Sequence, residues 1–174
     1  MMTKTEIENF LAAAYSKADY ELMFYQAKVS QELFSTIWEM VKEKPAHQSW
    51  RLLWILDHAT EKDNRFILPI LDEVYQLVLA TENESFIRHG MKLILRCEIN
   101  EDYAGELLDR CVKWMNDPKS KVSSQGSGLE FFYRVTQLYP EMAPELIAII
   151  DDIMERSPNK GYIVQLKKIR SEIA

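Results

Sequence analysis

The sequence predicts an all-α protein, and three observations support this fold class. Apolar residues recur at helical spacing in nearly every segment of the 174 residues, and the strictly alternating runs of half-buried strands are absent. Proline and glycine number only six and five, and most of them fall between the apolar runs. One apolar pattern also returns at near-constant spacing along the chain.

The expected helices follow one another with short connections. They cover residues 7–15, 20–27, 31–42, 46–60, 65–80, 84–97, 102–116, 121–139, 142–156 and 160–172. Thr5 is the N-cap candidate of the first helix, because a threonine side chain accepts a hydrogen bond from the first turn. Asparagine, which caps helix starts or takes left-handed stops, stands at three junctions, namely Asn64, Asn83 and Asn100. Pro69 and Pro144 fall in first helical turns, where the missing N–H costs nothing.

The strongest pattern is a repeat of paired helices. The template Leu33-Phe34-x-x-Ile37-Trp38-x-Met40-Val41 returns 37, 37 and then 39 residues later, with a break at Asp151. The helices between the copies keep the same register. Four residues each stand 17 positions past a template start, namely Trp50, Ile87, Ser124 and Ile163. This period is typical of an α-solenoid, and a plain bundle whose amphipathic helices match by chance is the alternative.

Three stretches carry a resemblance to a known class. They are "WRLLWILDHA" (50–59), "CVKWM" (111–115) leading into "VSSQGSGLEFFYRVTQLYPE" (122–141), and "ELIAIIDDIMERSPNKGYIVQLKKI" (145–169). The period and the two-helix unit are similar to HEAT or armadillo-type repeats, and residues 30–172 resemble a family of small bacterial HEAT-like proteins. We therefore expect one domain over residues 1–174, an α-α superhelix of about four helix pairs plus a C-terminal capping helix. Residues 1–29 are expected to form less regular N-terminal helices.

Some short proteins of this kind carry the label adenylosuccinate lyase. The serine-rich signature loop of that enzyme continues into Met-Pro and a lysine. In this chain Ser123-Ser124 is followed by Gln-Gly-Ser-Gly, so the similarity ends after two residues. We predict that the chain is not an adenylosuccinate lyase.

Composition and charge limit the classes of function that the chain can have. The net charge of -6 argues against general affinity for nucleic acid or anionic membranes, because both need a basic footprint. The chain starts without the apolar stretch of a signal peptide, and no segment has 18 uninterrupted apolar residues. Cys97 and Cys111 are widely spaced and stand at apolar helix positions, as expected of reduced core thiols in a cytoplasmic protein.

No catalytic or metal-binding constellation is apparent. The chain has no Gly-x-Ser-x-Gly, His-Glu-x-x-His or Gly-Lys-Ser/Thr motif. The group most similar to a metal site is Asp57, His58, Glu61 and Asp63, but neighbouring helical residues point about 100° apart. A solvated helix end is the preferred interpretation. We predict no enzyme activity, no cofactor and no metal.

The positions directly after Trp50, Ile87 and Ser124 supply the candidate binding residues. Arg51 and Arg88 would lie on adjacent repeats, where their guanidinium groups could hold a carboxylate or phosphate. The interpretation that we favour is a structural ladder, in which these arginines pair with acidic residues of the next repeat, namely Asp57, Asp72 or Asp109. Gln125 is the third member of the row, and Trp54 lies one helical turn after Arg51.

We predict that the chain is a non-enzymatic scaffold that binds a protein or peptide on its concave surface. The alternative is a nucleic-acid binder or enzyme similar to the HEAT-like DNA alkylation glycosylases, with a site near Arg51, Arg88 and Trp54. Trp54 nevertheless belongs to "WRLLWIL", which is apolar nearly all round, as expected of a helix inside a stack. Self-association through the ends of the solenoid is a further possibility.

The segment "SSQGSG" (123–128) has the composition of a loop, but the repeat register places it inside a helix. A glycine in a helix interior costs about 1 kcal/mol relative to alanine. Close packing against a neighbouring helix is the expected compensation, and a notch for a ligand is the alternative. On the first interpretation, Gly126→Leu costs several times more stability than a surface change.

Overall fold

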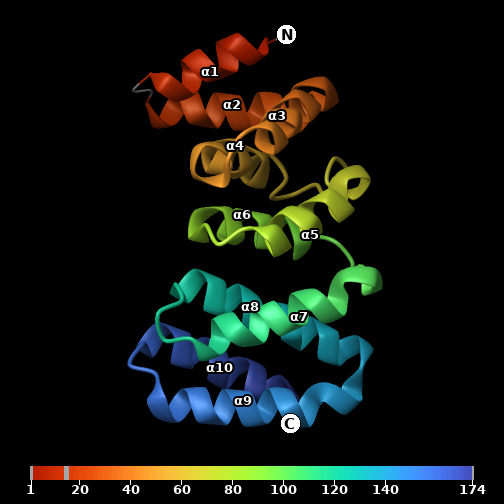
Figure 1. Cartoon of the computed structure of the whole chain (residues 1–174), viewed down its shortest axis with the longest axis vertical. Coiled ribbons are helices and arrows are strands. Elements are labelled where there is room, and N and C mark those ends of the chain that lie inside the picture. The colour runs from red at the N-terminus through yellow and green to blue at the C-terminus, as the bar shows by residue number, and fades with distance from the viewer. Residues whose placement is uncertain (1, 14–15, 174) are drawn as a thin grey trace. The chain divides into compact units, whose positions relative to one another are not determined.

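The computed structural model describes residues 2–13 and 16–173, and these residues form helices and connections without a strand (Figure 1). The chain divides into two compact units, Met1–Cys97 and Glu98–Ala174. The predicted all-α fold is confirmed, while the single domain over residues 1–174 stays a prediction. None of the described helices is long and apolar enough to cross a membrane.

The N-terminal unit contains three successive helix pairs in its described part. They are α1 (Lys4–Ala12) and α2 (Lys17–Val29), α3 (Gln31–Glu43) and α4 (Ala46–Ala59), and, after the 3-10 helix η1 (Leu68–Ile70), α5 (Leu71–Ala80) and α6 (Glu84–Ile94). The second helices form a continuous layer, because α2 packs on α4 and α4 packs on α6. The helix α1 packs on α3, so the first thirty residues extend the same layers.

The C-terminal unit contains two helix pairs. They are α7 (Glu101–Asn116) and α8 (Val122–Leu138), then, after the 3-10 helix η2 (Pro140–Met142), α9 (Ala143–Arg156) and α10 (Lys160–Ile173). Here too α7 contacts α9 and α8 contacts α10 (Figure 1). The helix α10 is thus the second member of the last pair, whereas the sequence predicted an additional capping helix.

The first copy of the repeat template lies in the core, as its periodicity predicts. All six apolar positions of the first copy, on α3, are at most 4% exposed. Trp114 in the third copy is 7% exposed, so both template tryptophans belong to the core. Cys97 and Cys111 are buried and not joined in a disulfide, and burial raises the pKa of the Cys111 thiol, which confirms their placement as core thiols.

Side-chain caps explain where several helices begin. Ser30 accepts a hydrogen bond from the Leu33 amide at the start of α3, and Asn83 accepts one from the Phe86 amide at the start of α6. The predicted cap at Thr5 is wrong. Thr3 caps α1 instead and forms a reciprocal capping box with Glu6, a pattern that is readable in the sequence.

Several predicted helix boundaries also differ from the structure, among them the helix expected over 20–27, which spans Lys17–Val29. The helix expected from residue 65 begins at Leu71, because residues 64–70 form turns and a 3-10 helix around Pro69. The helix expected over 84–97 ends at Ile94, and the Arg96 and Cys97 amides donate to carbonyl groups three residues earlier. The helix α1 ends at Ala12, and the predicted end at Tyr15 lies outside the described residues.

The segment 123–128 lies inside α8, as the repeat register predicts. A Cβ atom added to Gly128 would lie 3.0 Å from the Cys111 carbonyl oxygen and 3.3 Å from its Cα atom. A Cβ atom added to Gly126 would instead meet the side-chain oxygen of Gln165 at 3.0 Å. Close packing on a helix backbone is therefore found at Gly128, not at Gly126, where it was expected.

Gly105, unlike Gly126 and Gly128, has open space around it, and its replacement gives a simple prediction. It is exposed in the interior of α7, and nothing lies within 4 Å of an added Cβ atom. Gly105→Ala is expected to raise the free energy of unfolding by about 0.5–1 kcal/mol, because alanine loses less backbone entropy on folding. Urea unfolding measures this gain. In Gly90→Ala, where the added Cβ would clash with a Val78 methyl group, the same measurement should show a loss.

Candidate functional site

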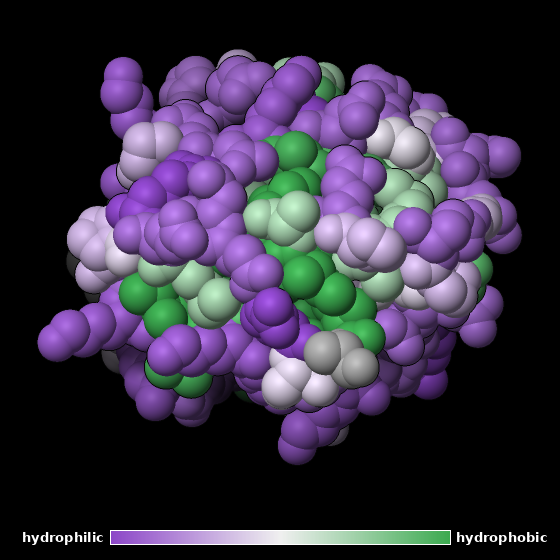
Figure 2. Space-filling model, turned by 90° about the horizontal axis from the view of Figure 1, so that it is seen from below, coloured by the Kyte–Doolittle hydropathy of each residue, from purple (hydrophilic) through white to green (hydrophobic). Residues whose placement is uncertain are grey.

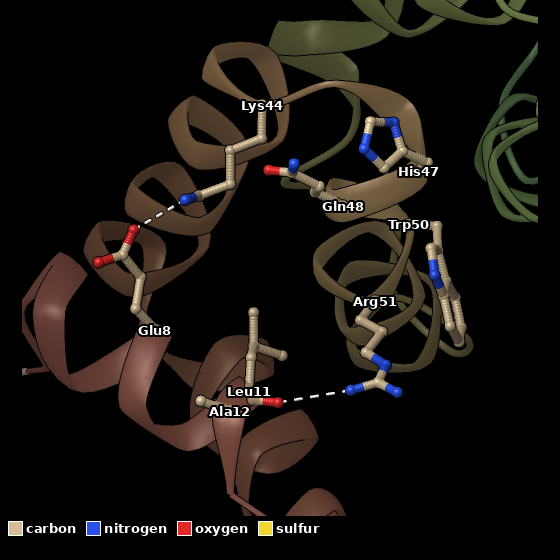
Figure 3. Close-up of a pocket in the computed structure, with 8 residues that line it drawn as sticks. All are labelled: Glu8, Leu11, Ala12, Lys44, His47, Gln48, Trp50 and Arg51. Atoms are coloured by element: carbon tan, nitrogen blue, oxygen red, sulfur yellow. Dashed lines mark hydrogen bonds and ion pairs between the residues drawn. The ribbon is translucent and has the colours of Figure 1, made fainter.

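A pocket of about 460 Å³ lies between the end of α1 and the start of α4. We call it the α1–α4 pocket. Figure 3 shows its lining residues, which are Glu8, Leu11, Ala12, Lys44, His47, Gln48, Trp50 and Arg51. All eight belong to the N-terminal unit. One of the four predicted binding residues, Arg51, lies here.

Local sequence explains why the start of α4 presents polar groups to the pocket. Pro45 stands at the N-cap of α4 without a side-chain cap, and its carbonyl accepts from the Gln48 and Ser49 amides. His47, Gln48 and Arg51 are exposed on one side of the first turns, while Leu52 is fully buried on the other side. Because of the helical period, the polar side chains face the pocket and the apolar ones face the core.

Two cationic groups lie on opposite sides of the pocket (Figure 3). The Lys44 ammonium pairs with the Glu8 carboxylate at 2.8 Å. Arg51 donates from Nη1 to the Leu11 carbonyl oxygen at a long 3.4 Å, and its guanidinium carbon lies 5.4 Å from the Trp50 ring centre. An arginine has five N–H donors in a planar fork that fits a carboxylate. The pocket can thus hold a carboxylate beside Trp50 and Leu11.

Trp54 does not line the α1–α4 pocket. Its ring centre lies 4.8 Å from that of Tyr20, 5.2 Å from that of Phe24 and 5.5 Å from that of His58. The indole is half-buried in this aromatic cluster between α2 and α4. Its contacts are those of a packing residue, and three rings already occupy its surroundings.

The other two predicted binding residues lie elsewhere. Arg88 is exposed on α6 and is not among the residues that line the pocket. Gln125 is 9% exposed on α8 in the C-terminal unit. Its Nε2 donates to the Asp117 carbonyl oxygen at 3.1 Å and its backbone carbonyl accepts from the Tyr162 hydroxyl at 3.4 Å. The structure thus uses Gln125 to hold the α7–α8 connection.

Asp57, a predicted partner of the arginine ladder, is fully buried but bonds to neither Arg51 nor Arg88. Its carboxylate accepts from Arg96 Nη2, from His89 Nδ1 at 2.8 Å and from Lys92 Nζ at 3.2 Å. Arg96 also donates to the Asp57 backbone carbonyl at 2.7 Å and thereby caps the end of α4. Asp57 therefore joins neighbouring repeats through Arg96, and not through either arginine of the predicted ladder.

The environment keeps the Asp57 carboxylate charged. Burial by itself would raise the pKa of Asp57, because it disfavours the charged form. The hydrogen bond from His89 and the charges of Arg96 and Lys92 outweigh burial, so the pKa lies below its ordinary value. This charged cluster joins α4 to α6 and stabilises the stack.

The residues considered as metal ligands do not converge. His58 Nδ1 pairs with Glu61 at 2.8 Å, while Asp57 points toward α6 and Asp63 pairs with Arg65 at 3.3 Å. Among the residues that the structure describes, no group of three or more histidine, cysteine or acidic side chains lies close enough to hold a metal ion.

Sequence analysis missed the basic partners of Asp57 and most of the pocket. His89 and Lys92 share one side of α6, Arg96 follows four residues later in the turn after this helix, and Asp57 is the acidic residue within "LLWILDHA". These two patterns together were a readable signal. Glu8 and Lys44 left no comparable signal, because they meet only through the packing of α1 on α3.

The comparisons with known proteins agree with this architecture. A family model described as a HEAT repeat domain matches residues 7–173. No curated protein and no solved structure matches the chain. The match begins inside α1 and ends at the last residue of α10, so it includes all or part of every described helix. The chain therefore belongs to the HEAT repeat domain family and is a helical repeat scaffold.

Proposed function

We propose that the chain is a non-enzymatic scaffold that binds a protein or peptide through an acidic group held in the α1–α4 pocket. HEAT repeats generally mediate protein interactions, which supports this class of function. The observation that carries the proposal is the placement of Arg51 at the pocket, with one long bond to Leu11 and further N–H donors. A carboxylate of the partner accepts from these donors.

The lining also defines what accompanies the carboxylate. Trp50 and Leu11 are half-buried and supply apolar walls, and the Trp50 ring supports the guanidinium plane. A bound residue with a carboxylate next to an aromatic or branched aliphatic group matches this chemistry. An acidic residue beside such a group, or an apolar C-terminal residue, provides it.

A peptide is favoured over nucleic acid as the ligand. Nucleic-acid binding needs several lysine or arginine contacts to phosphates. In the pocket one of the two strong cations, Lys44, is already paired with Glu8, and Trp54 is engaged by three rings. This proposal includes a cytoplasmic location and no adenylosuccinate lyase activity, as the sequence led us to expect.

Arg51→Ala tests the proposal. Peptides selected from a random display library on the full chain are expected to carry a carboxylate beside an aromatic or aliphatic residue. Arg51→Ala should weaken their binding by at least tenfold, because a charge-assisted hydrogen bond contributes about 1.5–3 kcal/mol. Fluorescence anisotropy with the labelled peptide measures the dissociation constant.

Two further variants complete the test: one is expected to tighten peptide binding, and the other is the control. Glu8→Gln removes the carboxylate that holds Lys44 and should tighten binding of the same peptide. Lys62→Ala removes an exposed positive charge outside the pocket and should leave binding unchanged. Selected peptides without enrichment of acidic groups, or equal binding to wild type and Arg51→Ala, would refute the proposal.

A further inference from the structure

The helix α1 is attached to the rest of its unit by few buried side chains. Of its nine residues, Ile7 and Phe10 are the buried ones, whereas α3, the helix on which it packs, buries six of thirteen. The Phe10 ring also contacts the Tyr20 ring of α2, with 5.1 Å between the ring centres. Because hydrophobic stabilisation follows the apolar area buried, these two anchors hold α1 less strongly than its neighbours are held.

Pockets lie on both sides of α1. The α1–α4 pocket borders it on the side of α4, and two further pockets of about 490 and 220 Å³ lie on the side of α2 and α3. Met2, Glu6 and Phe10 line these two pockets from the side of α1. The pockets interrupt the contact of α1 with its neighbours, so α1 gains less from van der Waals packing than a close-packed helix does.

Two exposed ion pairs join α1 to the end of α3. The Lys4 ammonium pairs with the Glu43 carboxylate, and the Lys44 ammonium pairs with the Glu8 carboxylate. The four side chains are 30–54% exposed. Exposed ion pairs contribute little to stability and are screened by salt, so these contacts also break easily.

The helix α10 is more firmly attached within its own unit. Tyr162 and Leu166 are fully buried and Ile169 is 6% exposed. Arg170 also donates from two nitrogens to both carboxylate oxygens of Asp151 on α9. Although apolar side chains remain at the centre of the face that carries α9, ringed by hydrophilic ones (Figure 2), α10 thus has more buried anchors than α1 and a two-point ion pair.

The position of α1 determines whether the α1–α4 pocket is formed. Glu8, Leu11 and Ala12 of α1 line one side of it, and Arg51 of α4 donates to the Leu11 carbonyl oxygen from the other side (Figure 3). A ligand carboxylate on Arg51 places its apolar neighbour against Leu11, so the ligand contacts both helices. Such a ligand favours the conformation in which α1 is docked.

We propose that α1 is a lid of the α1–α4 pocket, which opens and closes while the other helices of its unit stay folded, and that a ligand in the pocket holds it closed. This inference rests on the proposed function, because closure needs a ligand that contacts α1 and α4. Opening breaks the two ion pairs with α3 and withdraws Leu11, which separates the two sides of the pocket. Ligand release and the undocking of α1 are therefore coupled.

Hydrogen exchange of the full chain, followed by mass spectrometry, tests the proposal. A nine-residue helix is marginal by itself in water, so the amides of α1 exchange when it undocks. They should exchange at least about tenfold faster than the amides of α3 and α10. A peptide from the display selection, at twenty times its dissociation constant, should slow exchange in α1 about twentyfold and leave α10 unchanged.

Two substitutions on α3 distinguish a lid held by ion pairs from ordinary fraying of a helix. Glu43→Gln removes the partner of Lys4 outside the pocket lining and should speed exchange in α1 about two- to fivefold. Glu39→Gln is the matched control, because Glu39 is equally exposed at 54% but pairs with Lys42 of the same helix. This variant should leave exchange in α1 unchanged.

Three results would overturn the proposal. They are exchange in α1 that is no faster than in α10, equal responses of α1 to Glu43→Gln and Glu39→Gln, and a peptide that binds in fluorescence anisotropy without slowing exchange in α1. Failure of the proposed function gives a different result. In that case no selected peptide needs Arg51, while α1 still exchanges fast and responds to Glu43→Gln, so closure by a ligand is refuted and opening of α1 is supported.

Discussion

Asp57→Asn is expected to lower the free energy of unfolding by about 3–5 kcal/mol, the usual cost of breaking a buried ion pair by removing one partner. The Asp57 carboxylate is fully buried, and asparagine keeps its shape while removing its charge. His89, Lys92 and Arg96 then face a neutral amide. The connection between α4 and α6 weakens, and urea unfolding of wild type and variant measures the loss.

Asp152→Asn on α9 is the matched control. Asp152 is 64% exposed and pairs with Arg156 one helical turn away at 2.8 Å. An exposed pair of this kind contributes at most about 1 kcal/mol. Similar losses of unfolding free energy in the two variants would show that burial and the three donors do not increase the contribution of Asp57 to stability.

The same cluster predicts a dependence on pH. The pKa of Asp57 is lowered in the folded protein, because the His89 hydrogen bond and the Arg96 and Lys92 charges outweigh the effect of burial. The unfolded chain therefore binds this proton at a higher pH than the folded chain does. The stabilisation is complete above the unfolded pKa of about 3.9 and is lost as the pH falls through the lowered value. Wild type and Asp57→Asn should accordingly differ less at about pH 3 than at about pH 5.

Gly128→Leu is the second substitution with a large expected effect, a loss of about 3 kcal/mol. Its first added atom would lie 3.0 Å from the Cys111 carbonyl oxygen, which belongs to the backbone of α7. A backbone cannot rotate away as a side chain can, so α7 and α8 would have to separate. Thermal and urea unfolding both measure this loss.

Gly126→Leu, two residues earlier in α8, is the comparison. The atoms within 4 Å of an added Cβ at Gly126 belong to the end of the Gln165 side chain, which can rotate away. A helix interior also favours leucine over glycine by close to 1 kcal/mol, so we expect a net change below about 1 kcal/mol. If Gly126→Leu lowered the free energy of unfolding more than Gly128→Leu does, the sequence-based prediction of close packing at Gly126 would be supported instead.

Local sequence features were sufficient to predict the fold class. Helices alternate with short connections because apolar rows recur every three to four residues and because asparagine and serine caps mark several starts. The repeat was also readable, since the template positions of α3 are buried as their period requires. The errors arose at Pro69 and after Ile94, where tight turns replace a helix that the apolar pattern would continue.

The candidate site was predicted less completely. Arg51 was found through the repeat, and it lines the α1–α4 pocket. Glu8 and Lys44 were not found, because residues 36 apart come together only once α1 packs on α3. Arg88 was expected to pair with acidic residues through its alignment with Arg51. The turn after α6 brings Arg96 to Asp57 instead.

The sequence by itself determined the all-α class, the 37–39-residue period, the helical state of "SSQGSG" and the burial of both cysteines. Each follows from spacing along one helix, where a turn of 3.6 residues assigns every side chain to a face. Only the tertiary structure decided that Gly128 packs on α7, that Arg96 holds Asp57 and that Arg51 lines a pocket with Glu8 and Lys44. The contacts at these places join residues 17 to 40 positions apart, and their distances depend on how helices rotate and pack against one another.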